Sequence, residues 1–336
     1  MGIHISGGGG AVSDSVESLF IGAASFERRC TLGPIRFLED GGGLDRIRMG
    51  LFAEDSVELG GNIDTFKKSG ILLGKRINRF SSRSVWDWVW SVAREAYGNV
   101  IVDSSCLPRE PLAMLLFALS LRREFLESVR IDYVSVNSSS CGYATQNQDL
   151  DPSQQWLSRG VSCIRSIVGY PGDFRSGRTR HIVAFAGHEF DRLHETIVFY
   201  EPDRLSISSE ASKTSIVPGA VDYSNQVAER LRTEIALPEI REVSFCADSI
   251  EKTFRGLSEL SIDTNNENVA LVPMNTKLSF IGACLFALHH RDLRMVYAVP
   301  DQYNPLYSSG IGDCHRFDIT GILKKAGTPE VLPRER

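Results

Sequence analysis

The sequence has no long hydrophobic run and no organised set of cysteines. None of its apolar stretches reaches the roughly 20 residues that a membrane-spanning helix needs. Its opening, MGIHISGGGG, lacks the apolar segment of a secretory signal peptide. The seven cysteines are scattered and form no CxxC pair, which argues against a disulfide framework or a zinc knuckle. We therefore expect a cytoplasmic protein that contains no metal site.

Several catalytic signatures are also absent. The chain contains no GxSxG, no HExxH and no GxxxxGK phosphate loop. Its net charge of −5 and pI near 5.9 argue against an extended nucleic-acid-binding surface. With 336 residues, of which 42% are hydrophobic and 24% charged, the composition is typical of a globular protein of about two domains.

The chain does contain a repeated segment. Residues 99–119 and 268–288 align without a gap and share six identities, Asn, Val, Leu, Phe, Ala and Leu, where composition predicts about one or two. Each copy reads as a buried strand, a polar turn and a helix. A further strand follows each copy, and Tyr133 and Tyr297 occupy equivalent places in these strands.

An earlier pair of segments supports the repeat. LFIGAASFERR (19–29) and AFAGHEFDR (184–192) each predict a strand that runs into a helix. Gly22 aligns with Gly187. Because both pairs of segments occur in the same order, we interpret the chain as a duplication. The alternative is that any two strand–helix units look alike.

Alternating strands and helices predict an α/β fold with mostly parallel sheets and helices on both faces. We expect two tandem Rossmann-like repeats related by a pseudo-two-fold axis. The expected parts are a flexible tail at 1–17, unit one at 18–140, a polar linker at 141–155, unit two at 156–322 and a C-terminal tail at 323–336.

Ligands of parallel α/β sheets bind beyond the carboxyl ends of the strands, where helix N-termini present unbonded N–H groups. This rule selects four turns, at 22–28, 103–109, 187–192 and 273–279. In the last of them Asn275 or Thr276 can cap the helix, and Lys277 adds a positive charge. We expect this turn to hold a phosphate. The alternative is an ordinary capped helix with a solvated lysine.

The turn DSSCLPRE differs from its sister because it is acidic. Asp103, Ser104 and Ser105 end the strand, and Arg109 lies near the start of the helix. A carboxylate at a strand end can bind a ribose hydroxyl, a metal or a water molecule. The alternative is a plain helix cap.

The two glycine-containing turns share an acid followed by arginine. Gly22 and Gly187 allow close approach of the backbone, and Arg28 and Arg192 can reach a ligand cleft. The alternative is a local ion pair that stabilises each helix.

Two carboxylates, Asp103 and Glu189, are the catalytic candidates, the second because His188 precedes it. A loop at 300–317 is long, aromatic and rich in glycine, as ligand-binding loops often are. Its Tyr303, Asn304 and Tyr307 are expected to stack on a base and to hydrogen-bond to it.

The turn NTKLS after an apolar strand resembles the Thr-Lys turn of CARF-type domains, with Met274 and Asn275 standing where that family has glycines. The likeness covers residues 268–310. Domains of this family are Rossmann-like sensors of cyclic oligoadenylates in bacterial anti-phage immunity. The resemblance therefore implies a nucleotide ligand.

Three functions remain open at this point. The first is a sensor or accessory subunit that binds a nucleotide or another phosphorylated ligand in a bacterial defence assembly, with a protein partner or as a homo-oligomer. The second is a nucleotide-processing enzyme, a hydrolase, glycosidase or transferase, that uses Asp103 or Glu189. The third is a structural adaptor without a ligand. The sequence identifies no cofactor.

Overall fold

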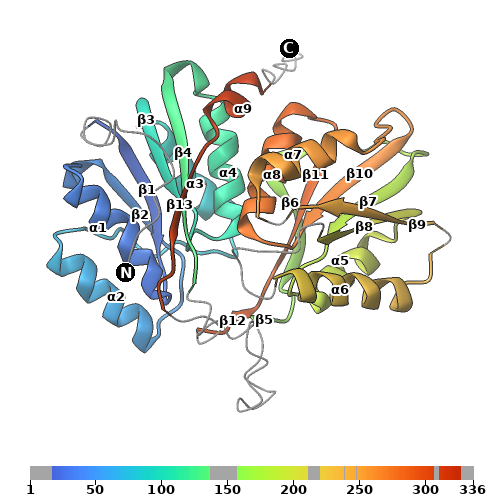
Figure 1. Cartoon of the computed structure of the whole chain (residues 1–336), viewed down its shortest axis with the longest axis horizontal. Helices are drawn as coiled ribbons and strands as arrows, with labels where there is room; N and C mark the ends of the chain where they lie inside the picture. Colours follow the sequence, from blue (N-terminus) through green and yellow to red (C-terminus); the bar gives the residue numbers. More distant parts are fainter. Residues whose placement is uncertain are drawn as a thin grey trace.

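The computed structural model describes residues 17–136, 157–210, 220–237, 239–246, 248–305 and 310–326. Two sheets of mostly parallel strands lie side by side with helices between and outside them (Figure 1). The first sheet contains, in spatial order, β13 (Cys314–Asp318), β4 (Leu126–Val134), β3 (Gly98–Asp103), β1 (Leu19–Ala24) and β2 (Ile47–Leu51). Only β13 runs antiparallel to its neighbour in this sheet.

The second sheet repeats this order over four of its strands. It contains β6 (Cys163–Pro171), β11 (Arg294–Val299), β10 (Glu267–Pro273), β7 (Thr179–Phe185), β8 (Arg204–Glu210) and β9 (Ile240–Phe245). The order β11-β10-β7-β8 corresponds to β4-β3-β1-β2, and the strands at 99–103 and 268–273 take equivalent places. In each sheet an antiparallel strand borders β4 or β11. The expected α/β class with mostly parallel sheets is confirmed, whereas the pseudo-two-fold relation stays a prediction.

Helices cover both faces of each sheet. The helices of unit one are α1 (Leu32–Glu39), α2 (Val57–Lys68), α3 (Ser82–Ala93) and α4 (Arg109–Ser120), with short 3-10 turns η1 (Arg28–Thr31), η2 (Leu44–Arg46) and η3 (Arg123–Phe125). Those of unit two are α5 (Phe190–Tyr200), α6 (Ala220–Glu234), α7 (Ile250–Glu259) and α8 (Lys277–His289), and α9 (Thr320–Lys325) follows β13. Figure 1 shows α3, α4, α7 and α8 between the two sheets.

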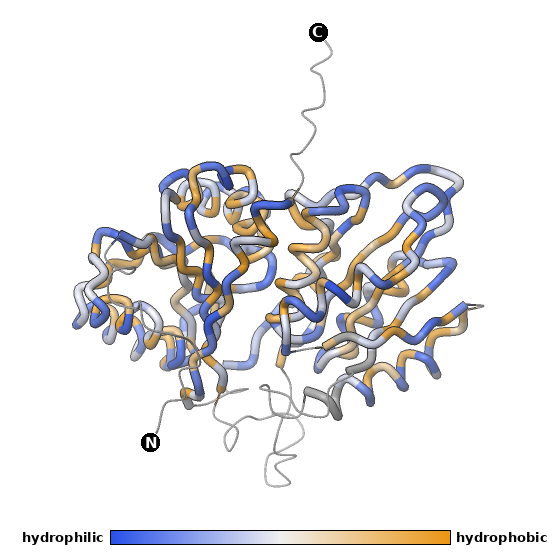
Figure 2. Tube along the Cα trace, turned by 45° about the horizontal axis from the view of Figure 1, so that its top comes forward, coloured by the Kyte–Doolittle hydropathy of each residue, from blue (hydrophilic) through white to orange (hydrophobic). Residues whose placement is uncertain are grey.

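The strand sequences explain this layering. Leu19 and Ile21 of β1 face the core that contains α3, α4, α7 and α8, whereas Phe20 and Ala24 face the opposite core with α1. In a strand alternate side chains point to opposite faces, so a continuous apolar run predicts burial on both. Helix α8 is buried nearly all round because its sequence, KLSFIGACLFALH, is apolar on every face. Figure 2 shows hydrophobic residues along the strands and helices in the interior of both units.

The end of the chain returns to the first sheet. β13 pairs with β4 from Cys314↔Val134 to Asp318↔Arg130, and α9 follows it. The division at residue 322 therefore does not describe the sheets, because residues 314–318, assigned to unit two, complete the sheet of unit one. No sequence pattern indicates this pairing, because the sequence of a short edge strand does not specify which strand it pairs with. The linker 141–155 lies outside the described residues.

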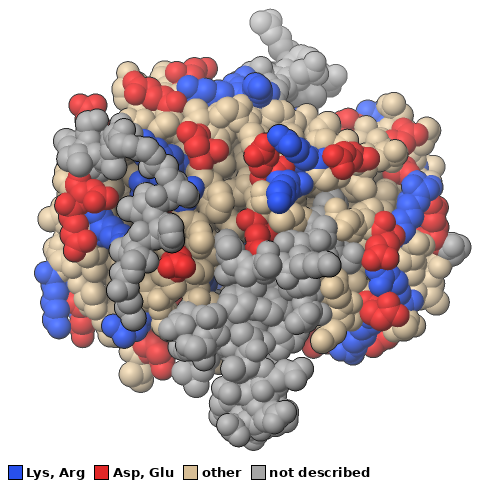
Figure 3. Space-filling view, in the orientation of Figure 1, with Lys and Arg blue, Asp and Glu red and all other residues tan. Residues whose placement is uncertain are grey.

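Within the described parts of the chain, no helix is long and apolar enough to cross a membrane. The same residues contain no cluster of three or more His, Cys, Asp or Glu that suits a metal ion. On the face shown in Figure 3, basic and acidic side chains of the described residues are interspersed.

Candidate functional site

One cavity of about 300 Å³ lies where the carboxyl ends of the two sheets meet. All four turns selected from the sequence contribute to its wall, through residues 24–27, 29, 106, 108–109, 188–189 and 275–277. Convergence of strand ends at one edge is a property of parallel sheets, and here two sheets present that edge to the same space. Other walls come from residues 52–56 after β2.

The cavity is lined by aromatic side chains from both units. Phe26, Phe52 and Tyr133 come from unit one, and His188 and Tyr303 come from unit two. Tyr303 lies in β12 (Gln302–Tyr303), which pairs with β5 (Ser158–Arg159). Flat aromatic surfaces beside a few polar groups suit a nucleobase.

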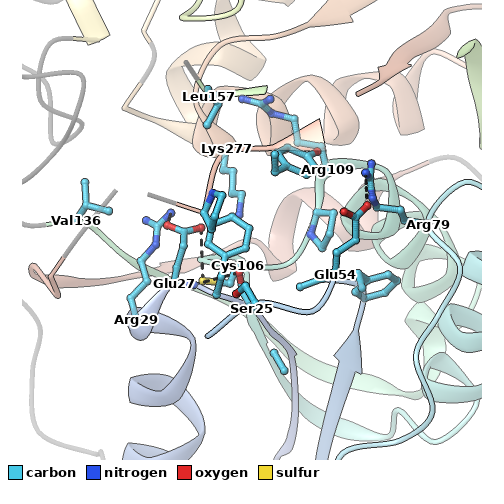
Figure 4. Close-up of a pocket in the computed structure, with 18 of the residues that line it drawn as sticks. Ser25, Glu27, Arg29, Glu54, Arg79, Cys106, Arg109, Val136, Leu157 and Lys277 are labelled. Carbon is cyan, nitrogen blue, oxygen red and sulfur yellow. Dashed lines mark hydrogen bonds and ion pairs between the residues drawn. The ribbon is translucent and has the colours of Figure 1, made fainter. Parts of the chain in front are cut away.

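Three arginines of the cavity wall pair with carboxylates, whereas Lys277 forms no ion pair with a carboxylate in the part of the chain that the structure describes. The three pairs are Arg29–Glu27 at 2.8 Å, Arg79–Glu54 at 2.9 Å and Arg109–Glu189 at 3.4 Å. Figure 4 shows the Glu54–Arg79 pair on one side of Lys277 and the Glu27 and Arg29 side chains on the other.

The ammonium group of Lys277 donates instead to the backbone carbonyl of Ser105. Among the described residues it forms no ion pair with a carboxylate. Burial, and secondarily the nearby charge of Arg29, lowers the pKa of Lys277 from 10.5 to about 8. Lys277 is therefore mostly protonated at neutral pH and brings a positive charge to the cavity, with Glu27 and Asp103 near enough to act on it electrostatically.

The turn before α8 is organised as the sequence predicts. Thr276 is the N-cap residue, and its hydroxyl accepts a hydrogen bond from the backbone N–H of Ser279 at 3.2 Å. The side-chain oxygen of Asn275 accepts from the N–H of Thr276 at 2.8 Å. Asn275, Thr276 and Lys277 all line the cavity, but the hydroxyl of Thr276 is engaged in capping. Lys277 and the helix terminus are thus the anion-attracting groups of this turn.

Asp103 lies behind the cavity wall rather than in it. It is 2% exposed, and one of its oxygens accepts from the hydroxyl and, at 2.9 Å, the N–H of Ser105. Burial raises the pKa of Asp103 to about 6. The hydroxyl of Ser104 donates to the carbonyl of Asp132, and that of Ser105 accepts from the N–H of Val134. These three residues therefore fasten the turn to β4, and it is Cys106, Pro108 and Arg109 of this turn that line the cavity.

Glu189 lines the cavity but is saturated with donors. Arg192 lies 2.5 Å away, Arg109 lies 3.4 Å away and the hydroxyl of Ser158 also donates to it. Burial alone would raise the pKa of Glu189, but the two arginines and Ser158 outweigh it and lower the pKa. Burial lowers the pKa of His188 to about 4. A carboxylate held ionised beside a neutral imidazole is a poor proton shuttle at neutral pH.

Arg192 supports the site from behind. Its guanidinium is buried, donates to the carbonyl of Ala298 at 3.1 Å and lies 5.2 Å from the ring centre of Tyr297. It does not line the cavity. The expectation that Arg192 reaches into the cleft is therefore replaced by a supporting role for Glu189.

The residue of unit one that corresponds to Arg192 is Arg29, not Arg28. Arg28 is exposed and lies outside the cavity wall. Arg29 pairs with Glu27 and donates to the carbonyl of Val134 at 2.8 Å. The sequence suggests Arg28 as the counterpart of Arg192 because each directly follows an acid, Glu27 or Asp191. In the structure Arg29 pairs with Glu27, two positions before it, and Arg192 pairs with Glu189, three positions before it.

The two aligned glycines take different places. Gly22 lies inside β1 against the side chain of Met49, so it is not at a turn. Gly187 follows β7, and a Cβ atom there would lie 2.4 Å from the carbonyl oxygen of Met274. Gly187 therefore permits a close approach, as expected, but what approaches it is the backbone of the turn at Met274 and not a ligand.

The loop residues are divided between the cavity and its surroundings. Tyr303 lines the cavity, and its hydroxyl lies 3.0 Å from that of Tyr297. Asn304 is buried, and its backbone N–H donates to the carbonyl of Leu157 at 2.9 Å. Tyr307 lies outside the described residues.

Several residues of the wall carry no recognisable sequence signal. Glu27 and Arg29 belong to FERR, in which two adjacent arginines are equally good candidates. Arg79 lies between α2 and α3 and donates to the carbonyls of Pro300 and Asp301 at 2.6 Å, which joins the two units beside the cavity. Contacts between residues 221 and 222 positions apart cannot be read from local patterns.

Comparisons with known proteins give a fold but no family. No protein-family model matches the sequence, and no curated protein matches it. Among solved structures the chain is similar to a type III CRISPR defence DNA nuclease activated by cyclic oligoadenylate, with a TM-score of 0.53 and 8% sequence identity. The similarity covers 88% of this chain and 67% of the nuclease chain. The chain thus shares the α/β fold of this nuclease, which agrees with the resemblance to CARF-type domains noted in the sequence.

Proposed function

We propose that the protein is a nucleotide-binding sensor of a bacterial defence system and that the cavity between its two units holds the ligand. The observation that carries this proposal is the charge of Lys277, which lies at the N-terminus of α8 in an aromatic-lined cavity and donates to a backbone carbonyl rather than to a carboxylate of the described residues. A phosphate satisfies such a charge, and aromatic walls satisfy a base.

The ligand class follows from the fold comparison. The similar nuclease is activated by cyclic oligoadenylate, which combines adenine bases with one phosphate per nucleotide. Among the described residues of the cavity wall, Lys277 is the cation outside an ion pair, and a single such cation favours singly charged phosphodiesters over a triphosphate, which would bring several negative charges to the same place. We therefore put cyclic oligoadenylates first among the candidate ligands.

The same residues favour binding over chemistry. Asp103 is enclosed in its turn, and Glu189 is held ionised by two arginines. The raised pKa of Asp103 would suit a base, but its carboxylate does not line the cavity, and the lowered pKa of Glu189 makes that carboxylate a weak base at neutral pH. A sensor that reports ligand binding to a protein partner or to a second copy of itself needs no such group.

The test is a titration of the full-length protein with cyclic tri-, tetra- and hexa-adenylate, AMP and ATP, followed by calorimetry. We expect at least one cyclic oligoadenylate to bind more tightly than ATP. Lys277→Met should weaken it tenfold or more, and Lys67→Met, which changes an exposed lysine of α2, should not.

Two results would overturn the proposal. One is the absence of binding by every nucleotide tested. The other is turnover of a nucleotide that is lost in Glu189→Gln, because it would make the protein an enzyme.

A further inference from the structure

Arg109 brings positive charge to the cavity besides Lys277. It is the first residue of α4, it lines the cavity, and its side chain is 15% exposed, so a ligand can reach it. Its guanidinium lies 3.4 Å from Glu189 and donates to the backbone carbonyl of Asn275. A guanidinium has five N–H groups, and these two contacts use part of that set. The Nε–H group is buried and has no hydrogen-bond acceptor in the part of the chain that the structure describes.

The carboxylate beside Arg109 is shared with a second arginine. Arg192 lies closer to Glu189, at 2.5 Å, and also donates to the carbonyl of Ala298 at 3.1 Å and to the hydroxyl of Ser158 at 3.3 Å. One carboxylate between two guanidinium groups leaves one positive charge in excess. Because Arg109 lines the cavity and Arg192 does not, a ligand meets this excess charge at Arg109.

Arg109 and Lys277 place their charges beside turns of different units. Arg109 comes from unit one, and its guanidinium lies beside Glu189 of unit two. Lys277 comes from unit two, and its ammonium donates to the carbonyl of Ser105 in unit one. Figure 4 shows the side chain of Lys277 extending toward Cys106 of the same unit-one turn. The cavity therefore offers two positive positions, and each is supplied by one unit and directed toward the other.

We infer that the ligand brings two anionic groups to the cavity, one to Lys277 and one to Arg109. A cyclic oligonucleotide meets this requirement, because its phosphodiesters are spaced around a ring and each carries one negative charge. A nucleoside monophosphate brings one such group and can satisfy only one of the two cations. The ligand thus contacts both units, and Arg109 binds it as directly as Lys277 does. This inference rests on the proposed function and adds to it the number of phosphates that the protein contacts.

The two contacts should contribute to affinity independently. The loss of a hydrogen bond between charged groups weakens binding about tenfold to a hundredfold. Contacts with different phosphates that share no partner add as free energies, so their losses multiply. The alternative is that Arg109 acts only by holding the turn at Asn275, and through it Lys277. In that case the removal of Arg109 would have little effect once Lys277 had been removed.

The experiment is a double-mutant cycle, measured by calorimetry on the full chain with the cyclic oligoadenylate that binds best. Arg109→Gln removes the charge and keeps an amide that can donate to the carbonyl of Asn275. We expect Arg109→Gln and Lys277→Met each to weaken binding about tenfold or more. The loss in the double variant should equal the product of the two single losses to within about twofold.

The matched control is Arg165→Gln. Arg165 also joins the two units, through Glu110 at 2.7 Å and the carbonyl of Phe80 at 2.6 Å, and its side chain is 20% exposed. It does not line the cavity, so its loss should leave ligand affinity unchanged.

A modified ligand tests the same point on the natural protein. In a form of the ring whose phosphodiesters, all but one, are replaced by neutral methylphosphonates, one of the two cations has no anion to bind. We expect affinity to fall about tenfold or more, beyond the statistical factor for the choice of phosphate. This comparison needs no variant and therefore decides the matter even if Arg109→Gln does not fold.

Unchanged affinity in Arg109→Gln would overturn the inference, and so would a double variant that binds no more weakly than Lys277→Met alone. A singly charged ring that loses no more than the statistical factor would overturn it as well. In each of these cases, weaker binding by Lys277→Met would leave the proposed function intact. If no nucleotide binds to the natural protein, the proposed function fails and the inference fails with it.

Discussion

Arg109 and Lys277 are the first residues of α4 and α8, and each donates to a backbone carbonyl in the turn that precedes the other helix. Arg109 donates to Asn275, and Lys277 donates to Ser105. The two units are therefore cross-linked at the floor of the cavity by a reciprocal pair of hydrogen bonds. A phosphate that engages Lys277 competes with one of them, which gives a ligand a direct route to the contact between the units.

The pKa of Lys277 predicts how ligand affinity depends on pH. The ammonium form binds an anion, and its pKa is lowered to about 8, so affinity should be full below pH 7 and decline as the pH rises through 8. Between pH 7 and pH 9 we expect a loss of about tenfold, from the fraction that stays protonated. Calorimetry at these two pH values measures it.

The control for this prediction is Lys277→Arg, whose guanidinium stays charged at pH 9. Its affinity should depend much less on pH. An equally steep decline in Lys277→Arg would show that another group is responsible.

Removing Arg192 should strongly destabilise the fold. Arg192→Met leaves the buried carboxylate of Glu189 without its nearest cation, and the loss of one partner of a buried pair costs about 3–5 kcal/mol. The matched change Arg83→Met removes an exposed partner of Asp87 and should cost less than about 1 kcal/mol. Denaturant unfolding of both variants measures the free energies. A cost below about 1 kcal/mol for Arg192→Met would contradict the assigned role.

His181 should make the fold sensitive to mild acid. It lies between Glu267 and Ser206, with each ring nitrogen 2.8 Å from an oxygen. Burial, together with the charge of Arg204, which also pairs with Glu267, lowers the pKa of His181 from 6.5 to about 4. The unfolded chain thus binds this proton more readily than the folded one. The contribution to stability is full above pH 6.5 and is lost as the pH falls toward 4.

The comparison that isolates this effect is the natural protein against His181→Gln. The difference in unfolding free energy between them should shrink by up to about 3 kcal/mol from pH 7.5 to pH 4.5, at about 1.36 kcal/mol per pKa unit. Chemical denaturation at several pH values provides the measurement. A difference that is constant over this range would show that His181 is not held neutral by the fold.

Two glycines should respond to alanine in opposite directions. Gly187→Ala places a methyl group 2.4 Å from the backbone oxygen of Met274, which cannot move without displacing the turn, so we expect a cost of about 1–3 kcal/mol. Gly60 lies in α2 with nothing within 4 Å of an added Cβ atom. Gly60→Ala should therefore stabilise by about 0.5–1 kcal/mol. Thermal unfolding decides both, and a neutral Gly187→Ala would mean that the two turns are less closely packed than described.

Much of the fold could be predicted from the sequence because its signals are local. Continuous apolar runs indicated the parallel strands, and the helix after Thr276 begins where the cap predicts. The place of the site was also predictable, since the carboxyl ends of parallel strands face one edge and the four turns line one cavity. The roles of individual side chains were harder to predict. Whether Asp103 and Arg192 face the cavity or the core depends on contacts with β4 and β11, which lie 29 to 106 residues away along the chain.

The pairing of β13 with β4 has a consequence for synthesis on the ribosome. The strands β1 to β4 emerge first, yet the edge of β4 stays unpaired until residues 314–318 have been made. Domains usually fold as they leave the ribosome, N-terminal part first. Here the earlier half must wait for almost the entire later half, and its open edge is the segment that a chaperone would need to shield in the meantime.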